Sequence, residues 1–544
     1  CPQEPSRHSR RTPQALANRG SWRGEEGGTE RCTDRGEEMA TFSLIFFTSL
    51  ASSVTAFVQG PTTTTTGLVG GVGSSSSSSS SRSERAWRQS WVSKTHHRAT
   101  AAAPTAAAAA APTVRQEGRR GGGLGMSAGG TDTVVVTGLG VVSGVGTGVD
   151  AFWEGLLKGE SSINRVEGFD PERFKCQIGS EVKDFDASKY FSARKSMRNN
   201  DRVTHFAVAA TKLAIEDAGV DVAASGERCG VMVGSAFGGM DTFEKQTLNL
   251  ENKGKVSPFT IPALLGNTAA GVIAIETGAK GPNFGIVSAC ASATHCLGEA
   301  MQAIREGEAD VMIAGGAEAA MTPLSFAGFC SMSAMATGHN DNPKAASRPF
   351  DADRSGFVMA EGGGVLILES LEHAKARGAR IYCELAGYGA SGDAHHITSP
   401  EPTGRGLSNA LDRALRSAGM AKEDVTYINA HGTSTNYNDK FETMAIKNTF
   451  GEDLAKEIYV SSTKGQTGHA LGAAGGLEAI ACAKAIQTGE LPPTINYDTP
   501  DPECDLRIFK EKVKVDRVKG ALSSNLLDRH PTASEERRGG RGQG

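Results

Sequence analysis

The stretch KGPNFGIVSACASATHCL, residues 280–297, decides the fold because its residue pattern changes at Cys290. A Gly-Pro pair marks a turn, and residues 283–288 after it form a short apolar run typical of a buried strand. Beyond Cys290 the apolar residues recur at helical spacing, and residues 310–316 form a second strand-like run. The sequence therefore predicts a strand–helix–strand unit with Cys290 at the first turn.

This position makes Cys290 a candidate nucleophile. At a strand-to-helix turn, unpaired backbone N–H groups and the positive end of the helix dipole stabilise a thiolate. A free cysteine is also often a small buried hydrophobic residue with no chemical role. The stretch alone leaves both interpretations open.

The composition indicates a reducing compartment and an acidic body. The ten cysteines form no CxxC pair and no Cys/His cluster at zinc spacing, so we expect no disulfide framework, no metal site and no cofactor. The formal net charge is −4, and residues 1–130 are net basic, so the remainder is more acidic than the whole. An acidic body argues against nucleic acid as a partner. No apolar run is long enough to predict a transmembrane helix.

Residues 1–130 do not have the pattern of a folded domain. Residues 1–38 look like translated upstream sequence, whereas Met39 begins a short apolar run and a small-x-small cleavage pattern that ends at Ala56, as in a signal peptide. Residues 57–130 are basic and contain polyThr, polySer and polyAla tracts, which is transit-peptide composition. The sequence predicts a signal-plus-transit leader to the plastid stroma, with a disordered extension as the alternative.

From residue 131 onward, strand-like and helix-like segments alternate, which predicts a mostly parallel, buried sheet. A glycine-rich run at 138–144 follows the first strand, but its GxGxxxG spacing is weak evidence for a nucleotide site and we interpret it as a tight turn. Two halves of comparable size, residues 131–379 and 380–525, suggest an internal duplication.

Two histidines follow strand-like runs in the second half, His431 in NAHGTST and His469 in STKGQTGHALG. Both lie in Gly/Thr-rich loops at the carboxyl ends of strands, where open α/β sheets bind ligands. Either histidine alone could be a structural hydrogen-bonding residue. Together with Lys464 and Cys290, they form a candidate nucleophile and base set.

These segments together resemble the β-ketoacyl-acyl-carrier-protein synthases of type II fatty acid synthesis. The resemblance runs from about Thr133 to Asn525 and rests on SAC at 288–290, AGGAE at 314–318, NPKAASRPFD at 342–351, NAHGTST at 429–435, and TKGQTGH at 463–469 with GAAGG at 472–476. It implies the α/β class, with a thiolase-like five-layer αβαβα fold of two similar halves, usually in a homodimer.

The resemblance also implies a reaction. Cys290 would take an acyl group from an acyl-carrier protein as a thioester, and the enolate formed when malonyl-carrier protein loses CO2 would attack that thioester. His431 and His469 would stabilise the enolate by hydrogen bonding.

Further residues take supporting roles by the same resemblance. Lys464 adds positive charge, and the family indicates Glu442 as the carboxylate that pairs with it. Asp439 belongs to the same supporting loop, and Thr433 and Thr435 would hydrogen-bond the pantetheine arm.

A basic stretch is the candidate docking surface for the carrier protein. The residues are Arg194, Lys195, Arg198 and Arg202, at the start of a helix expected over 192–217. Because carrier proteins are acidic, a local basic patch on an acidic body would steer their binding.

The chain departs from the family at its end. Relatives continue after Ser-Asn with a Phe/Gly-rich segment, which gates the acyl pocket and supplies an oxyanion donor, and then with a closing strand. Here residues 526–544 form an Arg/Gly tail instead. We expect this tail to be a gene-model artefact that would leave a neighbouring strand without its partner. A catalytically impaired homologue, a chain-length-factor-like partner and a biosynthetic thiolase are the alternatives, and the acyl chain length stays open.

Overall fold

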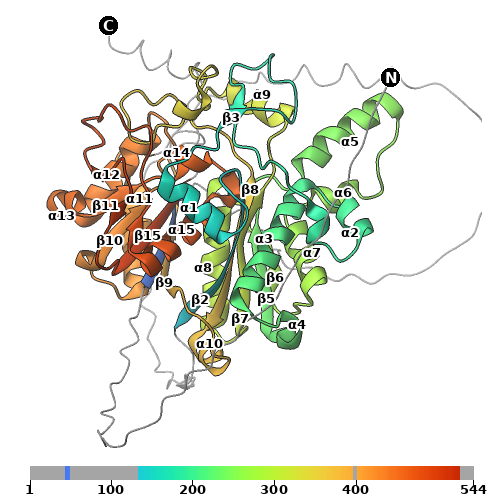
Figure 1. Cartoon of the computed structure of the whole chain (residues 1–544), viewed down its shortest axis with the longest axis horizontal. Helices are drawn as coiled ribbons and strands as arrows, with labels where there is room; N and C mark the ends of the chain where they lie inside the picture. The colour runs from blue at the N-terminus through green and yellow to red at the C-terminus, as the bar shows by residue number, and fades with distance from the viewer. Residues whose placement is uncertain (1–42, 50–132, 396–400, 527–544) are drawn as a thin grey trace, which may run out of the picture. The chain divides into compact units, whose positions relative to one another are not determined.

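The computed structural model describes residues 43–49, 133–395 and 401–526 (Figure 1). Apart from residues 43–49, the predicted leader lies outside these ranges, and so does the tail from 527 onward. Both predictions therefore stay predictions. Among the described residues, no helix combines the length and the apolar character needed to cross a bilayer.

The N-terminal half contains five strands in the order β6-β5-β7-β8-β2. Their bounds are β2 (Val134–Ser143), β5 (Cys229–Gly234), β6 (Asn283–Phe284), β7 (Val311–Glu318) and β8 (Gly362–Ser370). β5 runs parallel to β6 and β7, whereas β8 runs antiparallel to both of its neighbours, β7 and β2.

Alternate residues of these strands face different helix layers. Ile313 packs in a cluster with α3 (Arg202–Ala218) and α7 (Thr268–Thr277), whereas Met312 packs with α8 (Ser292–Arg305). Successive side chains point to opposite faces of the sheet, and both faces are covered by apolar helices. The strands therefore appear as continuous apolar runs in the sequence.

The C-terminal half repeats the arrangement, in the order β11-β10-β15-β1-β9 with β13 outside β11. The bounds are β1 (Ser43–Ser49), β9 (Cys383–Ser391), β10 (Val425–Asn429), β11 (Tyr459–Ser461), β13 (Arg507–Ile508) and β15 (Gly520–Leu526). α11 (Arg405–Ala418) and α12 (Asn438–Phe450) cover one face, and α15 (Ala474–Thr488) covers the other and contacts α8. The layers are thus α3/α7, sheet, α8/α15, sheet and α11/α12 (Figure 1). The predicted five-layer fold of two similar halves is confirmed.

The remaining elements are short or peripheral. The helices are α1 (Val149–Lys158), α2 (Arg194–Arg198), α4 (Val222–Ser225), α5 (Met240–Lys253), α6 (Thr260–Leu264), α9 (Pro323–Ser331), α10 (Leu371–Ala376), α13 (Glu452–Glu457) and α14 (Lys464–Thr467). The strands are β3 (Asn164–Arg165), β4 (Ile178–Gly179), β12 (Glu490–Leu491) and β14 (Val513–Lys514).

β1 fills the position that the symmetry of the two halves assigns to a closing strand. In the N-terminal half this position belongs to β8, between β7 and β2. In the C-terminal half, β1 lies between β15 and β9 and runs parallel to both of them. This differs from β8, which runs antiparallel to both of its neighbours in the N-terminal half. The expectation that β15 would lack a partner is therefore wrong for this structure, because an N-terminal segment supplies its backbone hydrogen bonds.

The glycine-rich run at 138–144 is not the predicted turn. β2 continues through Gly138 and Gly140, where an added Cβ would lie 2.3 Å from the carbonyl oxygen of Ala214 and 1.8 Å from that of Ala210. These glycines are required because α3 lies directly against the strand.

Two further expectations need correction. The strand before Cys290 is the two-residue edge strand β6, and Phe284 is exposed rather than buried because none of the strands in the described ranges covers that edge of the sheet. The helix expected over 192–217 is divided into α2 and α3, because Asp201 accepts a hydrogen bond from the Val203 N–H and caps α3.

Candidate active site

Cys290 lies in a strained turn directly before α8. A single 3₁₀ turn, Ala289–Ala291, carries it, and Ala289 has a φ of 50°, which a residue with a side chain rarely adopts. The Ser292 hydroxyl accepts a hydrogen bond from the Ser288 N–H (2.9 Å) and donates one to the Ala289 carbonyl (2.7 Å), which stabilises the turn. Cys290 is thus fixed at the N-terminal end of α8, where the sequence predicts it.

The two predicted histidines meet at this cysteine. Nε2 of His469 lies 3.0 Å from Sγ of Cys290, and the rings of His469 and His431 are perpendicular, with centroids 5.2 Å apart. One ligand atom from each of the three side chains lies within 4.8 Å of the others. His431 comes from the end of β10 and His469 from the loop after β11, so the carboxyl ends of the strands build the site as expected.

Both histidines are neutral near pH 7. Burial, followed by the positive charge of Lys464, holds the pKa of His431 and of His469 well below the usual range. Nδ1 of His469 has no hydrogen-bond partner among the described residues, whereas the Asn525 side chain lies beside the His431 ring. A neutral imidazole can donate its N–H to a carbonyl oxygen of a ligand or accept a proton from it.

The prediction that Glu442 pairs with Lys464 is wrong. The carboxylate that pairs with Lys464 is Glu478 of α15, and both side chains are buried. Glu442 instead accepts hydrogen bonds from the His431 N–H (2.8 Å), the Gly432 N–H (2.8 Å) and the Ser524 hydroxyl (2.6 Å). Glu442 therefore positions the His431 loop, and burial raises its pKa to about 7.

The other predicted loop residues are buried beside His431. Asp439 accepts a hydrogen bond from the Phe350 N–H (2.7 Å) and one from the Asn438 amide (3.1 Å), which connects α12 to the loop before β8. The hydroxyls of Thr433 and Thr435 lie 3.0 Å apart, on the loop after β10. The structure thus brings these three residues together as a support for the site.

A second supporting carboxylate, besides Glu478, was not predicted. Glu318, at the end of β7, accepts hydrogen bonds from the Ala236 N–H (2.7 Å), the Gly472 N–H (3.2 Å) and the Ser235 hydroxyl (3.1 Å). Burial raises its pKa to about 7. It joins the end of β5 to the loop that follows His469. The signal in the sequence is an acidic residue directly after a run of small apolar residues, Ala314 to Ala317.

The site opens into an apolar cavity of about 490 Å³. Its wall includes a chain of edge-to-face aromatic contacts, from His469 to Phe357 (5.5 Å), on to Phe329 (5.2 Å) and then to Phe237 (6.1 Å). The cavity is lined by Cys290, His469, Ala236, Phe237, Met240, Ala289, Leu324, Ser325, Gly328, Phe329, Met332, Phe357 and Leu471. An aliphatic chain attached to Cys290 would fit such a wall.

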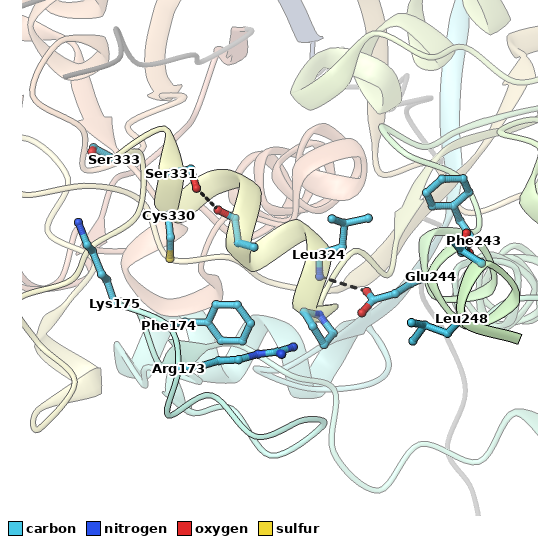
Figure 2. A pocket seen from close by; sticks show the side chains of 13 residues that line it. Arg173, Phe174, Lys175, Phe243, Glu244, Leu248, Leu324, Cys330, Ser331 and Ser333 are labelled. Carbon is cyan, nitrogen blue, oxygen red and sulfur yellow. Dashed lines mark hydrogen bonds between the residues drawn. The ribbon is translucent and has the colours of Figure 1, made fainter. Parts of the chain in front are cut away.

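A second, larger cleft of about 820 Å³ lies along another face of α9, and Cys290 does not line it. Figure 2 shows Arg173 and Lys175 beside Phe174 at one side of α9, with Phe243 and Leu248 of α5 at the other. The smaller cavity, which contains the nucleophile, is therefore the one that bears on catalysis.

The predicted docking residues separate into two groups. Arg194, Lys195 and Arg198 are exposed on α2 and form no ion pair among the described residues. Arg202 instead forms a two-point ion pair with Glu361 (2.9 and 2.6 Å) and donates to the Val182 carbonyl. This ion pair distinguishes Arg202 from the three residues of α2, and its part in docking stays a prediction.

Comparison with known proteins gives the same assignment. Residues 131–374 match the N-terminal domain of beta-ketoacyl synthase and residues 382–498 match its C-terminal domain. The 3-oxoacyl-[acyl-carrier-protein] synthase 2 of Synechocystis sp. is 48% identical over 396 residues, which cover 72% of this chain and 94% of that protein. The protein of the same name from Staphylococcus aureus is 46% identical over 396 residues, 72% of this chain and 95% of its own.

Solved structures of related enzymes share the fold. A beta-ketoacyl synthase from Burkholderia phymatum has a TM-score of 0.65 at 33% identity, covering 71% of this chain and 94% of its own. A type II polyketide ketosynthase, solved with its acyl-carrier protein and bound to the hexaketide, has a TM-score of 0.64 at 37% identity with the same coverage. The chain therefore belongs to the beta-ketoacyl synthase family.

Proposed function

We propose that this protein is a β-ketoacyl-acyl-carrier-protein synthase that elongates fatty acyl chains by decarboxylative condensation. One observation carries the proposal. Cys290 lies 3.0 Å from a neutral histidine, beside a second neutral histidine, at the mouth of an apolar cavity of about 490 Å³. A chain-length-factor-like role is not favoured, because the nucleophile is present and curated relatives over nearly their whole length are synthases.

The first half-reaction loads Cys290. Nε2 of His469 accepts the thiol proton while Sγ attacks the thioester carbon of acyl-carrier protein. The new C–S bond forms as the bond to the pantetheine sulfur breaks, and that sulfur leaves as a thiol once it takes the proton. The acyl chain then lies in the cavity against Phe329 and Phe357.

The second half-reaction forms the carbon–carbon bond. Malonyl-carrier protein loses CO2, and the electron pair of the broken bond becomes an enolate. The N–H groups of the buried side chains His431 and His469 donate hydrogen bonds to the enolate oxygen. The enolate carbon attacks the acyl thioester, and Cys290 leaves as a thiolate that takes a proton from solvent. We infer that Thr433 and Thr435 hydrogen-bond the pantetheine arm.

An elongation assay on the full chain tests this function. Cys290→Ala should abolish condensation with acyl-carrier substrates of graded chain length, while malonyl decarboxylation persists through the two histidines. Iodoacetamide should label Cys290 faster than Cys330, although Cys330 is the one described cysteine that is not buried. Full elongation by the alanine variant would refute the nucleophile.

The acidic carrier protein is proposed to dock on α2. Arg194, Lys195 and Arg198 present exposed charge, and a related ketosynthase has been solved with its carrier protein. Reversing these three charges should raise KM for carrier-bound substrate and leave small thioester analogues unaffected. Arg202→Glu is the contrasting variant, because loss of its ion pair with Glu361 should reduce activity on both substrates.

A second copy of the chain is proposed to cover the exposed edge strand β6. Large apolar side chains gather on this edge and on the neighbouring helices, and Ile275 and Val287 are 79% and 60% exposed. An edge strand with apolar neighbours is a ready-made pairing surface. Ile275→Lys should shift the protein from dimer to monomer in light scattering, and an unchanged mass would count against this interface.

Plastid import is proposed from the composition of residues 39–130. Import requires that residues 43–49 be removed, because cleavage after Ala56 takes β1 out of the sheet, whereas the fold described above retains them. The N-terminus of the protein purified from its own cells decides between them. A mature chain that starts near residue 131 supports the leader, whereas one that retains residue 43 supports β1. A reporter fused to 39–130 that stays in the cytosol would contradict import.

A further inference from the structure

The catalytic thiol and the two histidines have the composition and spacing of a transition-metal site. Cys290, His431 and His469 each place one ligand atom within 4.8 Å of the others, and all three side chains are buried. They are distant in the sequence, so no spacing motif reveals them. The sequence predicts no metal site, and only the fold brings these ligands together.

The geometry suits zinc after small movements. Zn–S bonds of about 2.3 Å and Zn–N bonds of about 2.0–2.1 Å place tetrahedral ligand atoms roughly 3.3–3.6 Å apart. The 3.0 Å separation between Sγ of Cys290 and Nε2 of His469 must therefore widen slightly. Any ligand atoms of the three side chains that lie as much as 4.8 Å apart must approach by about 1 Å. The apolar cavity leaves a fourth position open, as in sites with three protein ligands and one exchangeable ligand.

The described residues around the site tolerate the charge of a bound metal ion, but they do not hold every ligand side chain in place by hydrogen bonds. The positive charge of Lys464, which lowers the pKa of both histidines, also opposes a bound cation, but the ion pair with Glu478 offsets part of that opposition. Zinc-binding histidines normally donate their other N–H to a carboxylate or carbonyl, and loss of such a partner costs about 10–100-fold in affinity. Nδ1 of His469 has no such partner within the described ranges. Binding should therefore be reversible rather than that of a resident cofactor.

We propose that Cys290, His431 and His469 form an inhibitory site for thiophilic divalent cations such as Zn²⁺. The Cys290 thiol releases its proton to solvent as the metal–sulfur bond forms, and no oxidation is involved. The bound metal blocks acyl loading and covers the histidine nitrogens needed for the second half-reaction. A Cys290 that already carries an acyl group cannot bind the metal, so substrate protects the enzyme.

Cobalt provides a direct readout on the full chain. Titration with Co²⁺ should produce a thiolate-to-cobalt charge-transfer band, which Cys290→Ser should remove and Cys330→Ala should retain. His431→Asn should weaken Co²⁺ binding by at least about 10-fold, the loss that removal of even an outer partner brings. A band that persists in Cys290→Ser, or no band in the native chain, overturns the proposal.

Zinc protection of the thiol is the second readout. Zn²⁺ should slow iodoacetamide labelling of Cys290, EDTA should restore it, and Mg²⁺ should have no effect because it prefers oxygen ligands. Labelling at the same rate with and without Zn²⁺ would refute the site. The metal site rests on the arrangement of three side chains and not on the synthase reaction. Metal can therefore bind to a chain that shows no elongation activity in the metal-free assay, and an active chain can fail to bind metal.

Discussion

The buried ion pair between Lys464 and Glu478 gives a prediction that can be worked through quantitatively. The two residues are 1% and 2% exposed, and Glu478 is the ion-pair partner that the described residues provide for Lys464. Glu478→Gln would leave a buried ammonium group without compensation. Breaking a buried pair in this way lowers the free energy of unfolding by about 3–5 kcal/mol. The whole free energy of unfolding of a typical protein is about 5–15 kcal/mol.

The opposite change should cost less. In Lys464→Met the carboxyl of Glu478 stays, but burial already raises its pKa, and losing the nearby cation raises that pKa further. The carboxyl can then take up a proton and become neutral, which avoids a buried charge. The double variant Lys464→Met/Glu478→Gln contains no buried charge at this position, so it should be more stable than Glu478→Gln alone.

Urea unfolding of the full chain, followed by circular dichroism, measures these differences as shifts in midpoint. Asp241→Asn is the control, because Asp241 forms an exposed pair with Lys245 on α5, a kind worth about 0.3–0.5 kcal/mol. If Glu478→Gln unfolds at the wild-type urea concentration, the cost assigned to the uncompensated charge is wrong. If the double variant loses as much as the two single variants together, the residues are not coupled.

Three further predictions concern the pH response, the packing and the cavity. Burial raises the pKa of Glu318 from 4.5 to about 7, so its contribution to stability is fully present below pH 4.5 and is lost as the pH rises through 7. The stability difference between wild type and Glu318→Gln, from urea midpoints, should therefore change by up to about 3 kcal/mol between pH 4.5 and 8, and a constant difference would contradict this. Gly472→Ala should destabilise the protein by about 1–3 kcal/mol in thermal unfolding, because the new Cβ would lie 2.4 Å from the Ala236 nitrogen. Phe237→Ala should enlarge the acyl cavity and shift elongation towards longer chains, measured by product chain length.

Much of the site could be predicted because the residues that carry it follow local signals. Cys290 lies where a change from strand-like to helical spacing places it, and His431 and His469 follow short apolar runs that end in Gly/Thr-rich loops. Local chain pattern determines where such residues lie along an element. The parallel sheet then brings the ends of the elements together.

The partners of the buried charges could not be predicted in the same way. Glu442 and Glu478 both lie on helices next to the site, and which one meets Lys464 depends on how α12 and α15 pack. The sequence does contain a signal that was missed, because Glu478 is the one charged residue in the otherwise small and apolar run 474–483. A buried carboxylate in such a run requires a cation nearby.

The glycines of β2 show a second limit. Gly138 and Gly140 have the appearance of a turn in the sequence, since glycine most often marks one. Their actual role is to let α3 approach the strand, which depends on a helix about seventy residues further along. The two glycines are spaced i, i+2 and the residues they meet on α3, Ala210, Ala214 and Ala218, are spaced i, i+4, but neither pattern alone indicates its distant partner.

The position of β1 has a consequence for how the chain is made. The apolar segment 43–49 is synthesised before both of its neighbours, because β9 and β15 lie far downstream of it in the sequence. At about 5–20 residues per second, the segment must wait on the order of tens of seconds for both partners. The N-terminal half can fold during that interval, whereas the C-terminal sheet cannot close until β15 has been synthesised. A chaperone that shields the waiting segment should therefore raise the yield of folded protein, whereas one that binds only completed chains should not.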